Sequence, residues 1–95
     1  MKVVYTDISI DQTEIIKSYL LYKFTQREVE RFYKLLEKFD RRVVIFPEMY
    51  PVSVGNPGVR HAVLSKQLSV FYRTPQFTIT VLAILDNRMD PKKWP

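Results

Sequence analysis

Apolar residues in the first half of the chain recur at helical spacing, after a short hydrophobic run at 2–6 that predicts a first strand. Two helices are predicted, near 12–23 and 26–45, each with one apolar face. Because only about two residues separate them, they must fold back as an antiparallel hairpin. The apolar faces consist of Ile15, Ile16, Tyr19 and Leu20 in the first helix and of Val29, Phe32, Leu36 and Phe39 in the second.

Both predicted helix starts carry a capping-box pattern. Asp11 precedes the first helix and Thr25 the second, and a glutamate follows three residues later in each case, Glu14 or Glu28. In a capping box the first side chain accepts a hydrogen bond from an amide of the first turn, and the glutamate reaches back to the cap. Pro47 forces the second helix to stop.

The second half of the chain reads as strands. After a loop at 47–58 that is rich in proline and glycine, strands are predicted at 59–64, 68–74 and 77–86. The links between them are so short that the strands must form an antiparallel meander. The last strand is almost wholly apolar, which predicts burial on both of its faces.

The expected fold class is therefore α+β. It consists of an N-terminal strand, an antiparallel two-helix hairpin and a three-stranded antiparallel meander that together form one twisted sheet. Ninety-five residues suffice for a single domain, 1–95.

Composition excludes several classes of function. The chain has no cysteine, which rules out disulfides and thiol chemistry. It has a single histidine, and this histidine is not part of a metal-ligand spacing, so neither a metal nor a cofactor is expected. No apolar run reaches the length of a membrane span and no signal peptide is evident, which indicates a cytoplasmic protein. The net charge of +5 favours an anionic partner, nucleic acid or an acidic protein, although solubility alone also accounts for it.

Charged side chains mark the ends of the predicted strands. Arg60 and His61 are neighbours on one strand and therefore point to opposite faces. The meander places Arg60 level with Arg73, at the opposite end of the sheet from Asp86 and Arg88. Each of these residues also has a purely structural interpretation. Arg60 could be a charge at the sheet edge, His61 a packed surface residue, and Arg73 a residue that solvates the open face. Asp86 and Arg88 could form an ion pair that ends the strand.

The order and spacing of these segments resemble the RelE/ParE superfamily, the toxins of type II toxin–antitoxin modules. The resemblance covers nearly the whole chain and is carried by VVYT, the helical hairpin, FPEMYP, GVRHAVL, LSVFYR and the ending TVLAILDNRMDP. It implies a small twisted antiparallel sheet against two helices. It also implies neutralisation by a cognate antitoxin whose segment wraps the toxin, and the basic surface suits an acidic wrapping segment.

The resemblance leaves two modes of action open. RelE-like members cut messenger RNA in the ribosomal A site without a metal, whereas ParE-like members block DNA gyrase. Metal-free RNA cleavage needs a base, an acid and cations on the phosphate. If the chain is a ribonuclease, its candidate catalytic residues are Arg60, His61, Asp86 and Arg88. Of these, Arg60 matches the basic strand position of RelE-like enzymes, which implies a bidentate phosphate clamp.

The ending departs from the RelE-like pattern. Asp86 stands where a histidine is common in relatives, and an ionised aspartate cannot donate the second proton. His61, Glu48, Lys92 or Lys93 would have to supply it, and nothing in the sequence places one of them there.

This departure favours a ParE-like, non-nucleolytic growth inhibitor directed at DNA gyrase. The alternative is a RelE-like, ribosome-dependent endoribonuclease, so whether the chain is an enzyme stays open. A decayed module that retains only antitoxin binding is a third possibility. The residues predicted to bind partners, on the basic strand ends and the tail, are Arg73, Asn87, Lys92, Lys93 and Trp94.

Overall fold

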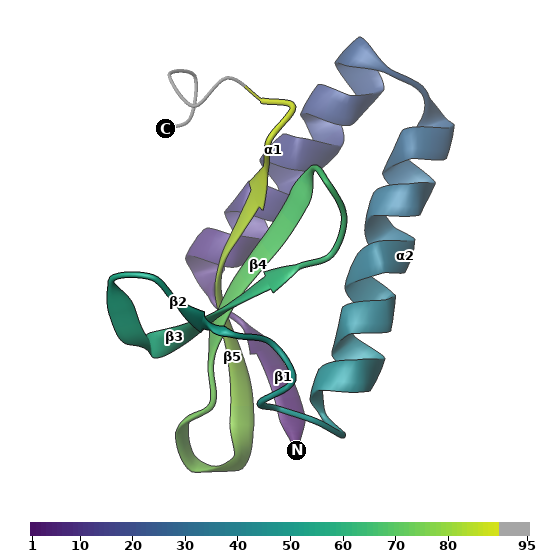
Figure 1. Cartoon of the computed structure of the whole chain (residues 1–95). Helices are drawn as coiled ribbons and strands as arrows, with labels where there is room; N and C mark the ends of the chain where they lie inside the picture. The colour runs from purple at the N-terminus through teal and green to yellow at the C-terminus, as the bar shows by residue number, and fades with distance from the viewer. Residues whose placement is uncertain (90–95) are drawn as a thin grey trace.

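Two helices pack against one face of a five-stranded sheet in the computed structural model, which describes residues 1–89 (Figure 1). The elements in chain order are β1 (Lys2–Tyr5), α1 (Asp7–Lys23), α2 (Gln26–Val43), β2 (Val52–Ser53), β3 (Asn56–Val63), β4 (Leu68–Arg73), the 3₁₀ turn η1 (Pro75–Phe77) and β5 (Thr78–Asp86). The predicted order of one strand, a helical hairpin and an antiparallel meander is confirmed.

Both helices contribute to one hydrophobic core. Alternate residues of β4 point into it, and the predicted apolar faces of the helices meet them there. The buried core residues are Ile16 and Leu20 of α1, Val29, Phe32, Leu36, Phe39 and Val43 of α2, Ala62, Leu68, Val70, Tyr72, Ile79, Val81 and Ile84 of the sheet, and Met89 after β5. No helix within the described residues has the length and apolar character needed to span a bilayer.

Helix α1 begins earlier than predicted. Its N-cap is Thr6, whose hydroxyl accepts a hydrogen bond from the amide of Ser9 at 3.2 Å, so that Asp11 lies inside the helix and caps nothing. The hydroxyl of Ser9 in turn donates to the carbonyl of Thr6 at 2.8 Å. The early start follows from β1, because the amide of Thr6 still bonds to Val81 of β5 and the chain turns directly from strand into helix.

Helix α2 begins after Thr25 as predicted but ends at Val43, two residues before the predicted position 45. The prediction of capping-box hydrogen bonds at this helix start is wrong. The hydroxyl of Thr25 makes no capping bond, and the amide of Glu28 bonds to the backbone carbonyl of Thr25 at 3.0 Å. The carboxylate of Glu28 is engaged elsewhere, by Arg88.

The sheet has the strand order β1-β5-β4-β3-β2 and is mixed rather than wholly antiparallel. The first strand pairs with the last in parallel, from Lys2 opposite Thr78 to Tyr5 opposite Val81. Parallel pairing is possible here because the whole helical hairpin and meander lie between the two strands in sequence. The two-residue strand β2, within the predicted loop, is too short to leave an alternating pattern.

A β-bulge in β5 sets which side chains face the helices. Tyr72 lies opposite Val81 and Phe71 lies opposite Ala83, so Leu82 is the extra residue. Beyond the bulge, even-numbered residues take over the inward face, and Asp86 is thereby directed inward. The predicted burial of both faces is wrong, because both helices cover the same side and the opposite face remains partly exposed.

Helix α1 also completes the edge of β5 beyond the end of β1. The amide of Ile84 donates to the side-chain oxygen of Gln12 at 2.8 Å, and the hydroxyl of Thr6 donates to the carbonyl of Leu82 at 3.4 Å. These contacts satisfy backbone groups that β1, four residues long, does not reach.

Candidate functional site

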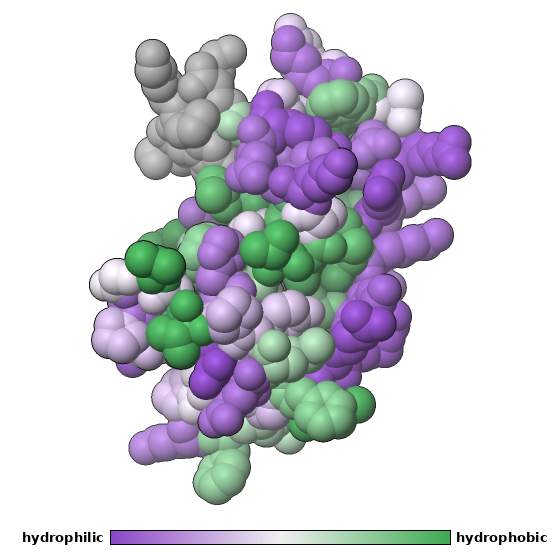
Figure 2. Space-filling model, viewed as in Figure 1, coloured by the Kyte–Doolittle hydropathy of each residue, from purple (hydrophilic) through white to green (hydrophobic). Residues whose placement is uncertain are grey.

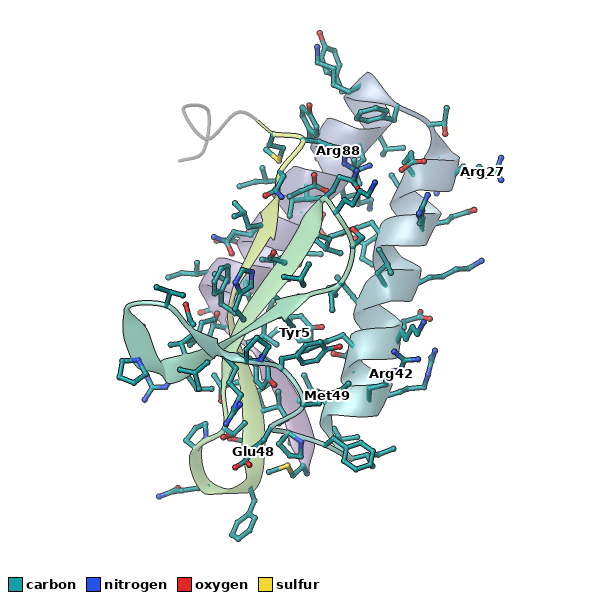
Figure 3. All side chains as sticks on the ribbon, viewed as in Figure 1. Tyr5, Arg27, Arg42, Glu48, Met49 and Arg88 are labelled. Carbon is teal, nitrogen blue, oxygen red and sulfur yellow. The ribbon has the colours of Figure 1, made fainter. Side chains whose placement is uncertain are left out.

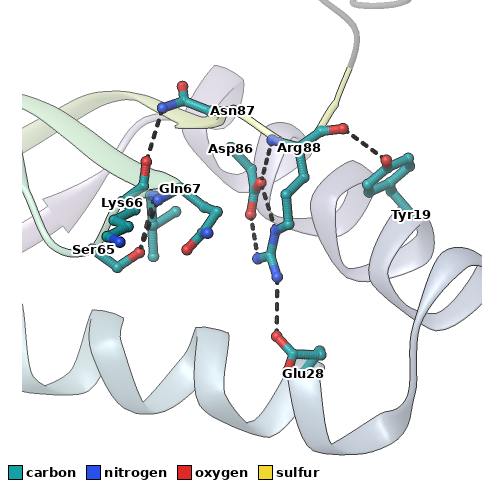
Figure 4. A network of polar contacts seen from close by, with 9 residues as sticks. Tyr19, Glu28, Ser65, Lys66, Gln67, Asp86, Asn87 and Arg88 are labelled. Carbon is teal, nitrogen blue, oxygen red and sulfur yellow. Dashed lines mark hydrogen bonds and ion pairs between the residues drawn. The ribbon is translucent and has the colours of Figure 1, made fainter.

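The carboxylate of Asp86, the last residue of β5, is fully buried and bound by one arginine (Figure 4). Arg88 donates from Nε to Oδ1 at 3.0 Å and from Nη2 to Oδ2 at 2.7 Å, a bidentate ion pair, and its backbone amide donates to Oδ1 at 2.9 Å. Both carboxylate oxygens therefore already have strong donors. The structural interpretation of this pair, in which it ends the strand, is the one that the geometry supports.

Arg88 also ties the end of β5 to both helices. Its Nη1 pairs with Glu28 of α2 at 3.0 Å, its guanidinium lies 5.4 Å from the ring centre of Phe24, and its carbonyl accepts a hydrogen bond from the hydroxyl of Tyr19 at 2.7 Å. Hydrogen bonding to Asp86 raises the pKa of Arg88 above its ordinary value; burial acts against this, and Glu28 adds to it. The arginine is thus a permanently charged junction between β5, α1 and α2.

Arg60 points to the helix side of the sheet and holds a loop. It lies opposite Tyr72, and its Nη1 donates to the carbonyl of Tyr50 at 2.7 Å and, more weakly, to that of Glu48 at 3.4 Å. The hydroxyl of Tyr72 donates to the carbonyl of Pro47 at 2.7 Å. The two side chains together fix the segment that joins α2 to β2.

His61 and Arg73 lie away from these contacts. The ring of His61 stacks on Phe71 on the helix-free face, with ring centres 4.4 Å apart, and within the described residues its Nε2 is buried without a hydrogen-bond partner. Arg73 is exposed at the end of β4. The prediction that Arg60 and His61 point to opposite faces is confirmed.

The four residues proposed as catalytic do not converge. Arg60 lies opposite Tyr72 and Asp86 lies opposite Leu68, which are four residues apart on β4, or about 13 Å along the strand. His61 adds a second separation, because it projects from the other face. The predicted placement of Arg60 near the Arg73 end of the sheet, away from Asp86, is confirmed.

Of the predicted binding residues, Asn87 has a structural role. Its side-chain amide donates to the carbonyl of Lys66 at 3.1 Å, and its backbone amide donates to that of Gln67 at 2.7 Å, so it secures the β3–β4 turn. Lys92, Lys93 and Trp94 lie outside the described residues. Within residues 1–89 no cluster of three His, Cys, Asp or Glu side chains is arranged to hold a metal ion.

Helix α2 carries a basic flank that was not predicted from the sequence. Arg27, Arg31, Lys34, Lys38 and Arg42 recur every three or four residues and therefore share one side of the helix. Figure 3 shows Arg27 and Arg42 extending outward near opposite ends of α2. The spacing was available in the sequence, but it is visible only when charged residues are examined for helical periodicity as apolar residues are.

Tyr5 and Asp40 form a partly buried hydrogen bond between β1 and α2, 2.8 Å from hydroxyl to carboxylate. Burial raises the pKa of Tyr5 well above its ordinary value, and the adjacent Asp40 adds to the increase. Burial also raises the pKa of Asp40, although the hydrogen bond from Tyr5 acts against this.

Because of Tyr5, the fold should lose stability at alkaline pH. An unfolded chain releases the tyrosine proton near pH 10, whereas the folded chain retains it. The stabilisation of the folded state by the protonated Tyr5 hydroxyl is therefore complete below about pH 10. As the pH rises further it is lost, by up to about 1.4 kcal/mol per pH unit. Urea unfolding measured from about pH 8 to about pH 11.5 should show a flatter decline for Tyr5→Phe than for the unaltered protein.

The matched control is Tyr22→Phe, which removes a hydroxyl from a side chain that is 82% exposed. The control should follow the pH dependence of the unaltered protein. An equally steep decline for Tyr5→Phe would contradict the assignment to Tyr5.

A strand, a helical hairpin and an antiparallel meander, with the first strand beside the last, define a RelE/ParE-like α+β fold. Among solved structures, the chain is similar to one described as "Chromosomal ParDE TA system from P. aeruginosa", with a TM-score of 0.75 and 17% sequence identity over 90% of this chain and 95% of that one. The likeness confirms the predicted fold, and at this identity it concerns the fold alone. No family model matches the chain, and no curated protein matches it by sequence.

Proposed function

We propose that this protein is the toxin of a type II toxin–antitoxin module, neutralised by a cognate antitoxin, and that it inhibits growth in the ParE-like, non-nucleolytic manner, with DNA gyrase as its target. The fold shared with a chain of a ParDE system supports the toxin role. The net charge of +5 suits an acidic antitoxin segment. Action on gyrase places the protein in the bacterial cytoplasm.

The observation that carries the non-nucleolytic assignment is the engagement of Asp86. A general base must reach the hydroxyl that it deprotonates, and a phosphate clamp must present free donors. Here the carboxylate of Asp86 is buried under Arg88, and Arg60 donates to the carbonyls of Tyr50 and Glu48. The two groups best suited to RNA cleavage are both committed to holding the fold together.

The alternative is a RelE-like, ribosome-dependent messenger RNA endoribonuclease. The basic flank of α2 favours it, because a row of cations along one side of a helix suits a nucleic-acid backbone. In that case the ribosome would have to release Arg60 from its loop carbonyls before it could bind a phosphate.

Induced expression in bacteria of the unaltered protein and of Arg60→Gln should distinguish the two functions. We expect arrested growth, intact messages on mapping of messenger RNA 5′ ends, and inhibition of gyrase supercoiling by the purified protein. Arg60→Gln should retain all three properties, because the glutamine amide keeps a donor near Tyr50 and the loss of stability should be only about 1 kcal/mol.

Arg41→Gln is the matched control, since it removes an exposed arginine on α2 and the same charge. New 5′ ends at codon-specific positions, lost in Arg60→Gln but not in Arg41→Gln, would establish the ribonuclease instead. Normal growth together with intact messages and active gyrase would indicate a decayed toxin.

A further inference from the structure

A furrow runs along α2 on the side that faces the β3–β4 turn. It consists of two adjoining hollows of about 540 and 220 Å³, which meet at Leu35. We call it the α2 furrow. Figure 2 shows hydrophobic side chains in the middle of this face and hydrophilic side chains over α2. The furrow's half-buried apolar residues are Leu35 of α2, Tyr50 of the loop and Leu64 after β3.

Cations border the α2 furrow. Arg31, Lys38 and Arg42 line it from α2 and Lys66 lines it from the β3–β4 turn; all four are exposed. In the described part of the chain the salt bridges within 4.0 Å are those of Arg88, so these four cations have no acidic partner. The acidic residues Glu30, Glu37 and Asp40 lie on the other flank of α2, as their spacing in the helix requires. Glu28 also lines the first hollow, but its carboxylate is paired with Arg88. With four unpaired cations, the furrow is therefore electropositive.

The opposite wall of the furrow is an open strand edge. The amide of Leu64, directly after β3, bonds toward β4, and within β3 the amide of His61 bonds outward to Pro51. By the alternation of an antiparallel ladder, the amide and carbonyl of Val63 also point outward. Strand β2 reaches only Arg60, and no other strand in residues 1–89 covers this edge. Val63 itself is 60% exposed, and because the edge is open its outward backbone groups can pair with a further strand.

We propose that the α2 furrow binds an extended acidic peptide segment of a partner protein, added as a strand at the Val63 edge of β3. Every second side chain of the segment enters the furrow, where glutamate stems lie over Leu35 and Leu64 and their carboxylates meet the cations. The identity of the partner as the antitoxin rests on the proposed function, whereas the site itself rests on this geometry.

The dimensions match such a segment. From Arg31 to Arg42 the helix rises about 16 Å, which is the length of about five extended residues. Lys38 and Arg42 are about 6 Å apart along the helix axis, close to the roughly 6.6 Å between alternate side chains of a strand. A nucleic-acid strand would use the cations but neither the backbone groups of Val63 nor the apolar floor.

Binding can be measured directly with an acetylated, fluorescently labelled decapeptide that alternates Glu and Val, compared with one that alternates Lys and Val. At near-physiological salt we expect only the acidic peptide to bind, and its addition to the isotope-labelled protein should shift the amide resonance of Val63. The double reversal Lys38→Glu/Arg42→Glu should weaken binding at least about tenfold, because two charge-assisted contacts are lost.

The matched control is Arg41→Glu/Arg73→Glu, which changes the net charge equally at exposed positions that do not line the furrow. It should weaken binding less than about threefold, since salt screens charges beyond a Debye length of about 8 Å. Val63→Pro removes the outward amide but no bond to β4, and should weaken binding about tenfold, whereas Val63→Thr should not.

Three results would overturn the proposal, provided that circular dichroism shows the variants to be folded. They are equal binding of the Lys–Val peptide, equal losses in the furrow variant and its control, and displacement of the acidic peptide by a 12-nucleotide polyuridine RNA that binds more tightly. None of these measurements uses growth or gyrase. A failure of the proposed toxin activity would therefore leave the binding result intact, and a failure of binding would leave the activity intact.

Discussion

Arg88→Met is expected to lower the free energy of unfolding by about 3–5 kcal/mol, because it leaves a buried carboxylate without its counter-ion. The side chain of Asp86 is 0% exposed and would keep only the backbone amide of residue 88 as a donor. The same substitution removes the contacts of the guanidinium with Glu28 and Phe24, so that the end of β5 loses its side-chain link to α2 and keeps only the hydrogen bond from Tyr19 of α1 to the carbonyl of residue 88. Urea unfolding followed by circular dichroism measures the loss.

Two further variants test whether the buried charge is the cause. Glu28→Gln removes the more exposed partner of Arg88 and should cost less than about 1 kcal/mol. Asp86→Leu/Arg88→Met replaces both members of the buried pair by apolar groups and should recover most of the stability lost in Arg88→Met. If Arg88→Met and Glu28→Gln proved equally mild, the buried ion pair would not hold this end of the sheet.

Phe39→Ala is the second large effect, with an expected cost of about 3–5 kcal/mol. Phe39 is 1% exposed and packs edge-on against Tyr72, with ring centres 5.5 Å apart, and against Tyr50 at 5.8 Å. The cavity left by the Phe39 side chain would open beneath the loop at 47–51, where the carbonyl of Tyr50 accepts a hydrogen bond from Arg60. We therefore expect both a lower urea midpoint and faster hydrogen exchange in the loop at 47–51.

The control for this substitution is Tyr22→Ala, because Tyr22 is also aromatic and helical but 82% exposed. Its cost should stay within about 0.5 kcal/mol. A loss below about 1.5 kcal/mol for Phe39→Ala, or an unchanged loop, would show that the aromatic cluster does not support the loop.

The sequence predicts the elements of this fold better than their boundaries. Helix α2 follows its periodic apolar positions closely, because an amphipathic helix on a sheet has only one way to bury them. The start of α1 is mispredicted because the helix is capped by Thr6 and not by Asp11. Thr6 directly follows β1, and its amide is still hydrogen-bonded to Val81 of β5, so the helix begins immediately after it. That bond joins residues 75 positions apart and is invisible to local patterns.

The site was less predictable than the fold. Charged residues at strand ends were identified correctly, but their partners depend on register and on the bulge at Leu82. Without the extra residue, Asp86 would project from the open face and the ion pair with Arg88 would form in solvent. The role of Arg60 depends on a loop that folds back over the sheet, and no pattern in the sequence predicts its contact with Tyr50.

The pairing of β1 with β5 also bears on the order in which the protein folds. The register joins Lys2 to Thr78, so the loop to be closed contains most of the chain. The helical hairpin and the β3–β4–β5 meander are built from contacts between neighbouring segments, which form quickly, whereas a distant pair incurs the full loop-closure entropy. We expect β1 to dock last, onto a nucleus that the hairpin and meander have already formed. Until it docks, one edge of β5 is open to pairing with another chain, and this interval is when newly made molecules are most prone to associate.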